Sequence, residues 1–291
     1  MKRLALVFMF VAMNSSGLYA ESLKDLHEKP ISSLEELRKY ADSLPSQGER
    51  HYALGLGYLT YHREQEAWGE FEKILRLDPG NGNALWGKAE ILRRNSEYKK
   101  SLEILDEVLK KNPEHVPSLI TKSYTELLLG ALHQSIKTAA VVERLQGAGK
   151  AVDKPNLARA YLIIATAQIQ IARKSFFLGK LQALSVKWYI MKAVEINPEA
   201  AEVRFALGNF YLFAPGFWGG NVDAAISEFN KTLHKDPQFM DAYVRLVQAY
   251  RKKNDVTRSQ FYLEKIKELD PRNKLAKELG LSSVFNNDSL Q

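Results

Sequence analysis

The sequence repeats a unit of 34 residues, and this period constrains the fold more than any other feature. The clearest copy, residues 48–81, contains two stretches in which apolar residues recur at helical spacing. A short polar turn around Arg63 separates the two stretches, and Asp78-Pro79 ends the second. Each unit therefore predicts two amphipathic helices joined by a tight turn.

Prolines mark the places where the repeats end. Pro45, Pro79 and Pro113 stand 34 residues apart, as do Pro237 and Pro271. Proline lacks an amide hydrogen and disfavours helix in the residue before it, so each of these positions predicts a helix end. No stretch of convincing length alternates as a strand does, and the predicted fold class is all-α.

The unit combines residue type and spacing at six positions, namely Leu54, Gly55, Tyr58, Ala67, Phe71 and Pro79. This pattern resembles the tetratricopeptide repeat, whose 34-residue unit is a helix–turn–helix. The resemblance implies a right-handed superhelical solenoid in which each repeat packs on its neighbours. The small residues Gly55 and Ala67 predict a close approach of two helices, and Phe71 is expected to fill the space between helix pairs.

Two interruptions of the period set the expected boundaries. Pro113 and Pro198 are 85 residues apart, and Pro198 and Pro237 are 39 apart, which indicates a longer hairpin and a wide turn. The expected order is a signal peptide (1–20), an N-terminal capping helix (21–47), repeats one to three (48–147), an elongated divergent helical hairpin (148–198), repeats five and six (199–271), and a C-terminal capping helix with a disordered tail (272–291). We expect one continuous array.

The first 20 residues have the pattern of a secretory signal peptide. Lys2 and Arg3 precede an apolar run over residues 4–13, and small or polar residues lead to Ala20, after which cleavage is expected. An apolar run of this length is too short to span a bilayer, so no transmembrane span remains after cleavage. The protein is predicted to be periplasmic, with secretion or an uncleaved N-terminal anchor as alternatives.

The search for catalytic or metal-binding chemistry finds no specific motif. The chain has no cysteine, its six histidines fall in different units without a ligand pair, and no phosphate-binding glycine loop occurs. The net charge of +7 comes from basic residues spread over helix faces, so nucleic acid is not an expected partner. We therefore expect no enzymatic activity, no cofactor and no metal.

In proteins that this sequence resembles, the first helix of each repeat lines a concave face that binds peptides or a partner helix. Carried over by position, the predicted partner-binding residues are Tyr52, Leu56, Trp86, Glu90, Arg93, Ile120, Tyr124, Phe205, Asn209 and Phe213. Tyr52 and Leu56 replace the lysine and asparagine with which one subgroup grips a C-terminal carboxylate, so that mode is not expected. Because adjacent helix residues point about 100° apart, we expect Leu85 to pack between helices and Trp86 to face the concave side.

The turn over residues 214–221 is unusual because it places Phe217 and Trp218 beside two glycines. Glycine permits backbone angles closed to other residues, so the chain can reverse sharply there. Two interpretations stay open. The aromatic rings either pack into the adjacent hairpin and fix the turn, or form an exposed contact for a partner.

The leading functional hypothesis is a non-catalytic scaffold that binds a protein or peptide through its concave, aromatic-rich face. The alternative is a carrier of a hydrophobic small molecule, as implied by resemblance to repeat proteins that accompany substrate-binding-protein transporters. No motif in the sequence decides between the two.

Overall fold

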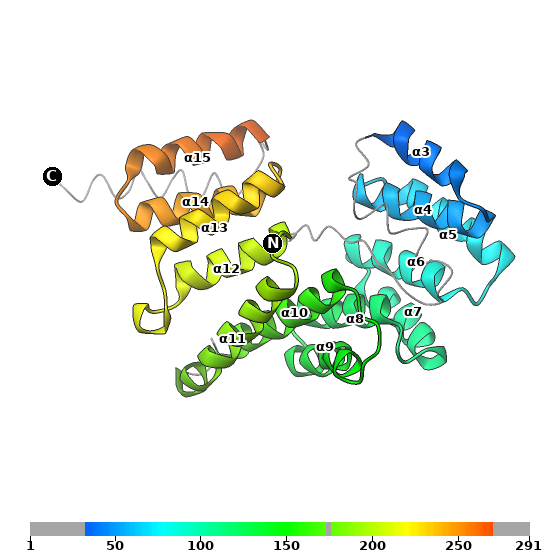
Figure 1. Cartoon of the computed structure of the whole chain (residues 1–291), viewed down its shortest axis with the longest axis horizontal. Coiled ribbons are helices and arrows are strands. Elements are labelled where there is room, and N and C mark those ends of the chain that lie inside the picture. Colours follow the sequence, from blue (N-terminus) through cyan, green and yellow to red (C-terminus); the bar gives the residue numbers. More distant parts are fainter. Residues whose placement is uncertain (1–32, 173–175, 270–291) are drawn as a thin grey trace. The chain divides into compact units, whose positions relative to one another are not determined.

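The structure is a computed structural model that describes residues 33–172 and 176–269, with the side chains of residues 184–269 described in the second range (Figure 1). Within these ranges there are thirteen α-helices, one short 3₁₀ turn and no strand. The predicted all-α fold is confirmed. The signal peptide and the C-terminal capping helix that we expected lie outside the described residues.

The helices alternate with short turns throughout the described ranges. Their bounds are α3 Leu34–Ser43, α4 Gln47–Thr60, α5 Glu64–Leu77, α6 Gly82–Arg94, α7 Tyr98–Lys111, α8 Val116–Leu128, α9 Leu132–Gly147, α10 Lys154–Ala172, α11 Phe176–Ile196, α12 Ala201–Phe213, the 3₁₀ turn η1 Gly216–Trp218, α13 Val222–Lys235, α14 Met240–Lys252 and α15 Val256–Leu269. Helices α5, α7, α11 and α13 each end within two residues of a proline, as the spacing of prolines predicts.

The chain forms two compact units, and the division falls inside α11 between Tyr189 and Ile190. This division differs from the single continuous array that we expected. It lies in the segment 148–198, where extra residues interrupt the 34-residue period and lengthen α10 and α11 to 19 and 21 residues. The two units are described separately below.

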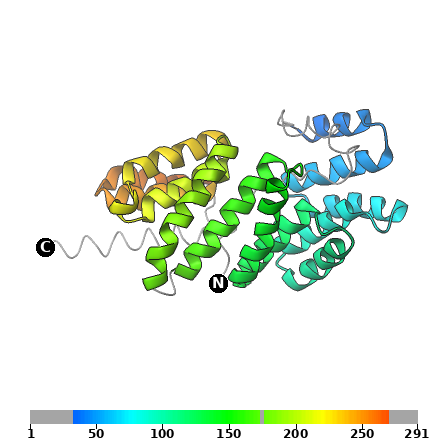
Figure 2. The ribbon, with the colours of Figure 1, turned by 60° about the horizontal axis from the view of Figure 1, so that its bottom comes forward.

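The first unit has the two-row packing of a helical repeat. Each of its helices from α3 to α10 packs against the next one in sequence, and α4, α6, α8 and α10 also pack against one another (Figure 2). These four helices form the inner row, and α5, α7 and α9 form the outer row. The first helix of each 34-residue unit therefore meets the first helix of the following unit.

Small residues allow the close packing that the sequence predicted. Phe71 is fully buried, and its ring lies where a side chain on either Gly55 or Gly87 would stand. Phe71 thus fills the space between two repeats, and the prediction for this position is confirmed. Ser101 stands at the small position of the second helix in the next repeat, and its Oγ donates a hydrogen bond to the carbonyl oxygen of Ala89 over 2.8 Å.

The N-terminal helix α3 covers one face of α4. Ser33 is its N-cap and accepts a hydrogen bond from the amide of Glu36 over 3.1 Å. Leu37 is fully buried, and its methyl groups occupy the space that a side chain on Gly57 would need. That this helix caps the array stays a prediction.

The second unit, described over residues 190–269, repeats the same arrangement with α12 and α14 in contact and α13 and α15 beside them. A buried core joins these helices and is built from Phe205, Leu212, Ala225, Phe229, Phe239, Ala242, Leu246, Ala249 and Tyr250. Gly208 repeats the role of Gly55, because a Cβ added there would lie 2.5 Å from the ring of Phe229.

Candidate partner-binding site

The predicted contact residues of the first unit are buried in this structure. They come from the inner-row helices α4, α6 and α8, and they are Tyr52, Leu56, Trp86, Glu90, Arg93, Ile120 and Tyr124. Position therefore placed them on the expected helices. Contact with a partner stays a prediction for each of them.

The orientation expected for Leu85 and Trp86 is reversed. Leu85 is partly exposed, whereas Trp86 is fully buried. The indole Nε1 of Trp86 donates to Oγ1 of Thr121 in α8 over 2.9 Å, across the boundary between two repeats. The reason is that first helices of successive repeats pack against each other, so the fifth position of a repeat meets the next first helix rather than solvent.

A buried carboxylate links three helices of the inner row. Glu90 in α6 is fully buried, and it accepts hydrogen bonds from Arg93 Nε at 2.8 Å and from Arg94 Nε at 2.9 Å. Thr121 of α8 donates to the same carboxylate over 3.3 Å, and Arg94 NH1 donates to the carbonyl oxygen of Leu59 in α4 over 2.7 Å. Glu90 therefore joins α4, α6 and α8 through one network.

Charge pairing keeps Glu90 ionised despite its burial. Burial by itself would raise the pKa of the Glu90 carboxyl, but the guanidinium groups of Arg93 and Arg94 outweigh it and hold the pKa below its ordinary value. Arg93 is also 4.9 Å from the ring centre of Tyr124, a cation–π distance. The network is thus charged and closely paired in the folded state.

The second unit exposes one of its predicted residues. Phe205 is buried in the core, Asn209 is partly buried, and Phe213 at the end of α12 is 55% exposed. Two cations from α14 approach the Phe213 ring, with Arg245 Cζ at 5.1 Å and Lys252 Nζ at 5.4 Å from its centre. An exposed aromatic ring close to two cations is a feature typical of contact surfaces.

Polar groups beside Phe213 have unused hydrogen-bonding capacity. Asn209 Oδ1 and Arg245 Nε have no hydrogen-bond partner within the described residues, although both atoms are shielded from solvent. Burial lowers the pKa of Arg245 and raises that of Asp241, and the attraction between these two groups opposes both shifts. We name Asn209, Phe213, Arg245 and Lys252 the Phe213 surface.

The turn between α12 and α13 contains two glycines in constrained positions and exposes an aromatic ring. Gly219 has a φ of 99°, in the left-handed region, and a side chain on Gly220 would collide with the carbonyl of Ala214. Phe217 is 80% exposed and Trp218 is partly buried, with their ring centres 4.9 Å apart. The two predicted contact residues of this turn therefore differ, because only Phe217 projects fully into solvent.

Comparison with known proteins agrees with this architecture. Tetratricopeptide-repeat family models match residues 52–116 and 241–273. The chain is a tetratricopeptide-repeat protein. No curated protein matches its sequence.

Solved structures with the same fold include three other tetratricopeptide-repeat proteins of low sequence identity. Pseudomonas aeruginosa pilF has a TM-score of 0.56 at 16% identity, covering 81% of this chain and 97% of its own. A tetratricopeptide-repeat protein from Parabacteroides merdae has a TM-score of 0.56 at 17% identity, covering 90% and 95%. PilW, a type IV pilus biogenesis factor, has a TM-score of 0.58 at 14% identity, covering 81% and 99%. At these identities the likeness concerns the fold alone.

The described helices contain neither a cluster of metal ligands nor a membrane-spanning segment. In the part of the chain that the structure describes, no three histidine or acidic side chains gather as metal ligands would. No helix within the same residues has the length and apolar character needed to cross a bilayer.

Two residues of these surfaces were not found from the sequence. Thr121 and Arg245 do not stand at the family's contact positions that we carried over, and each acts on a residue of the preceding repeat, Trp86 and Phe213 respectively. A signal for them would require the packing of successive first helices, which spacing within one repeat does not contain.

Proposed function

We propose that this tetratricopeptide-repeat protein is a non-catalytic scaffold that binds a protein or peptide partner through the inner helices of its repeats. The observation that carries the proposal is the Phe213 surface, where an exposed aromatic ring lies within cation–π distance of both Arg245 and Lys252. Aromatic and arginine side chains contribute most of the binding energy in many interfaces.

The chemistry of the Phe213 surface indicates the class of partner segment. The exposed ring offers an apolar contact, and Arg245 and Lys252 offer positive charge next to it. A peptide with an apolar side chain next to a carboxylate matches these groups.

In the proposal, the inner row of the first unit is already assembled before a partner binds. The Glu90 network joins α4, α6 and α8 by hydrogen bonds, so these three helices are held together without a ligand. In this structure Trp86 and Tyr124 are buried, and direct contact between either ring and a partner requires a change in its exposure.

The proposal includes export to the periplasm, with secretion as the alternative. Its support is the order of charged, apolar and small residues over positions 1–20. N-terminal sequencing of the protein from its native host tests this point. A mature chain that begins at or near Glu21 supports export, and an intact N-terminus in soluble cytoplasmic protein contradicts it.

One hollow in the described residues bears on the carrier alternative. A hollow lined by Gly48, Tyr52, Ile74, Asn81 and Asn83 has an empty volume of about 150 Å³. Pockets for small ligands usually measure about 300–1,000 Å³. This hollow is therefore too small to serve as the site of a lipid-like ligand.

A photo-crosslinking amino acid at position 213 tests the proposed function in the native envelope. We expect it to capture one stoichiometric protein, whose dissociation constant is then measured with the wild-type chain and two variants. Phe213→Ala should weaken binding by about tenfold or more. The matched control is Phe261→Ala, since Phe261 is equally exposed, at 55%, but lies on α15. Recovery of a lipid-like molecule from the purified protein, with unchanged protein binding in Phe213→Ala, would instead support the carrier.

A further inference from the structure

The turn between α12 and α13 holds its aromatic tip by its own hydrogen bonds. The amides of Trp218 and Gly220 both donate to the carbonyl of Pro215, over 2.9 and 3.0 Å, and Asn221 donates to the carbonyl of Tyr211 over 2.8 Å. The glycine geometry described above adds to this constraint. The 80% exposure of Phe217 is therefore a property of an ordered turn.

Basic residues at the end of α14 lie beside this turn. Lys252 Nζ donates to the carbonyl of Leu212, just before the turn, over 2.7 Å. Lys253 pairs with Asp223, just after the turn. The C-terminal end of α14 is thus attached to both sides of the aromatic turn, and the turn into α15 lies at the same end of the unit (Figure 1).

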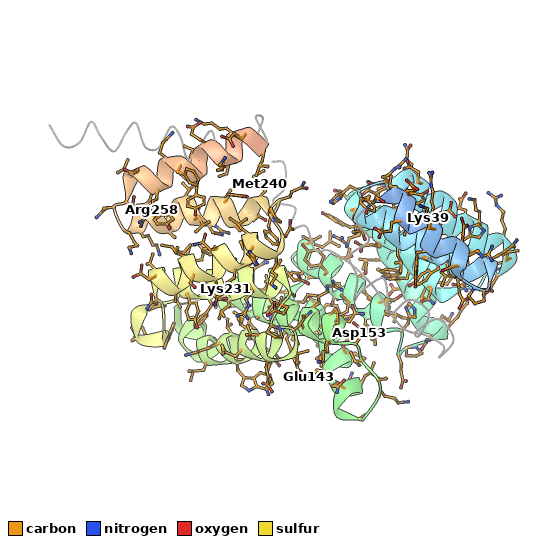
Figure 3. All side chains as sticks on the ribbon, turned by 45° about the horizontal axis from the view of Figure 1, so that its top comes forward. Lys39, Glu143, Asp153, Lys231, Met240 and Arg258 are labelled. Carbon is orange, nitrogen blue, oxygen red and sulfur yellow. The ribbon has the colours of Figure 1, made fainter. Side chains whose placement is uncertain are left out.

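The start of α15 extends the same edge. Val256, its first residue, is 73% exposed, and Arg258 follows within one helical turn. Arg258 lies at the opposite end of this helix pair from Met240 (Figure 3). Seven residues at this end of the second unit form what we name the aromatic–basic edge. Five of them are exposed, namely Phe217, Lys252, Lys253, Val256 and Arg258, and Trp218 and Arg251 are partly buried.

Cations outnumber carboxylates on this edge. Arg251, Lys252, Lys253 and Arg258 supply four positive charges, and the two carboxylates among these turns are Asp223 and Asp255. Asp223 pairs with Lys253, and Asp255 lies 3.3 Å from Arg258. The formal charges of these two turns therefore sum to +2, beside the exposed aromatic tip.

We propose that the aromatic–basic edge docks the protein onto an anionic phospholipid surface. Phe217 and Trp218 enter the interfacial layer, where amphipathic aromatic rings are favoured, while the neighbouring lysines and arginines contact lipid phosphates. Insertion removes exposed apolar surface from water, and the charge excess adds long-range attraction. This interaction is peripheral and reversible, as expected for a small aromatic tip without a spanning helix.

The geometry favours a membrane over a peptide as the occupant of this edge. A bound peptide needs a groove, or unpaired backbone groups to which it can add. Here the tip projects outward, and the amides of residues 218–221 are used inside the turn or on α12. A projecting apolar tip with surrounding cations instead fits a flat, negatively charged and deformable surface.

Flotation with phospholipid vesicles tests the proposal on the full chain. Vesicles of phosphatidylcholine with 30% phosphatidylglycerol are compared with vesicles of phosphatidylcholine alone. Residues 1–20 are present in every variant and contain an apolar run, so differences between variants and between vesicle types are scored. We expect tighter binding to the anionic vesicles, and weaker binding as salt rises.

Two pairs of matched variants separate the parts of the edge. Phe217→Ser with Trp218→Ser should weaken binding to anionic vesicles by at least about tenfold, whereas Phe261→Ser, an exposed phenylalanine on α15, should leave it unchanged. Lys253→Gln with Arg258→Gln should weaken it by about fivefold or more. Lys265→Gln with Lys267→Gln removes the same charge near the far end of α15 and should leave binding to anionic vesicles unchanged.

The outcomes also separate this proposal from the proposed function. Phe217→Ser alone, at an 80% exposed position, serves if the double variant does not fold. Equal binding of the Phe217 variants and wild type, or equal binding to anionic and neutral vesicles, would overturn the proposal. So would loss of a protein partner in the Phe217 variants without any effect on vesicles. Phe213→Ala should affect protein binding while vesicle binding persists, so either proposal can fail without the other.

Discussion

Buried polar side chains in the inner row form specific hydrogen bonds between repeats, and His115 is an example. Its side chain is almost fully buried at the N-cap of α8. Nδ1 accepts a hydrogen bond from the amide of Ser118 over 3.3 Å and lies 2.7 Å from its hydroxyl, and Nε2 lies 3.0 Å from Oδ1 of Asn83 in α6. An acceptor at Nδ1 and a donor at Nε2 require the neutral imidazole.

The stability of the protein should therefore depend on the protonation of His115. Burial lowers the pKa of His115 from 6.5 to about 4, so the unfolded chain binds this proton more readily than the folded one. The stabilisation is complete above about pH 6.5 and is lost as the pH falls toward 4. Between pH 7.5 and 5 we expect a loss of roughly 2 kcal/mol in the free energy of unfolding, measured by urea denaturation.

The variant His115→Asn isolates this contribution. Asparagine is a good N-cap residue but does not titrate in this range, so the variant should lose less stability than wild type between pH 7.5 and 5. The same dependence on pH in both proteins would show that His115 is not the group responsible.

Glu90 provides a second test at the residue scale. Removing its carboxylate leaves Arg93, which is 9% exposed, buried without its principal partner. We expect Glu90→Ala to cost about 3–5 kcal/mol of stability, the usual range for breaking a buried pair. Glu72→Ala is the matched control, because Glu72 is 41% exposed where it meets Lys88 and its loss should cost much less stability. Similar chemical-denaturation midpoints for the two variants would contradict the assigned role of Glu90.

At the scale of the helix, glycine decides how closely two helices approach. A side chain at Gly87 in α6 would collide with the buried ring of Phe71 in α5, whereas nothing lies within 4 Å of a side chain at Gly69 in α5. Both glycines are inside helices, so they share the same backbone preference for alanine. Their difference is therefore one of packing alone.

Substitution by alanine should change the free energy of unfolding in opposite directions at these two glycines. Gly87→Ala is expected to lower the free energy of unfolding by about 1–3 kcal/mol through overpacking. Gly69→Ala is expected to raise it by about 0.5–1 kcal/mol. Thermal or urea unfolding of the two variants measures both effects, and a stabilising Gly87→Ala would show that Phe71 can move aside at little cost.

The same elements show what sequence could and could not predict. The period and the proline spacing predicted the helix ends, and the positions of Gly55 and Phe71 predicted a close contact, because these features repeat within one unit. The direction of Trp86 was predicted wrongly, because it depends on Thr121 in the next repeat. The cations around Phe213 were partly missed for the same reason, since Arg245 belongs to a different helix pair.

At the scale of the whole molecule, each repeat depends on its neighbours. A helix of the inner row packs on its own partner and on the next first helix, so a repeat has no complete core of its own. In the described residues no repeat precedes the first one, and α3 packs on that side of α4 instead. We therefore expect α3 to shield an apolar face of α4 that would otherwise be exposed to solvent.

Disrupting α3 should therefore have consequences beyond the helix itself. Leu37 is fully buried against Gly57, so Leu37→Asp places a charge in an apolar contact and should cost about 3 kcal/mol or more. Deletion of residues 32–44 should go further, exposing the covered face of α4 and promoting aggregation, which light scattering detects. Lys39→Asp is the control on the same helix, because the Lys39 side chain is 75% exposed and pairs with Glu35, which is itself exposed. A deleted protein as soluble and as stable as the full chain would refute the capping role of α3, and the first repeat would then have to be stable with that face open to water.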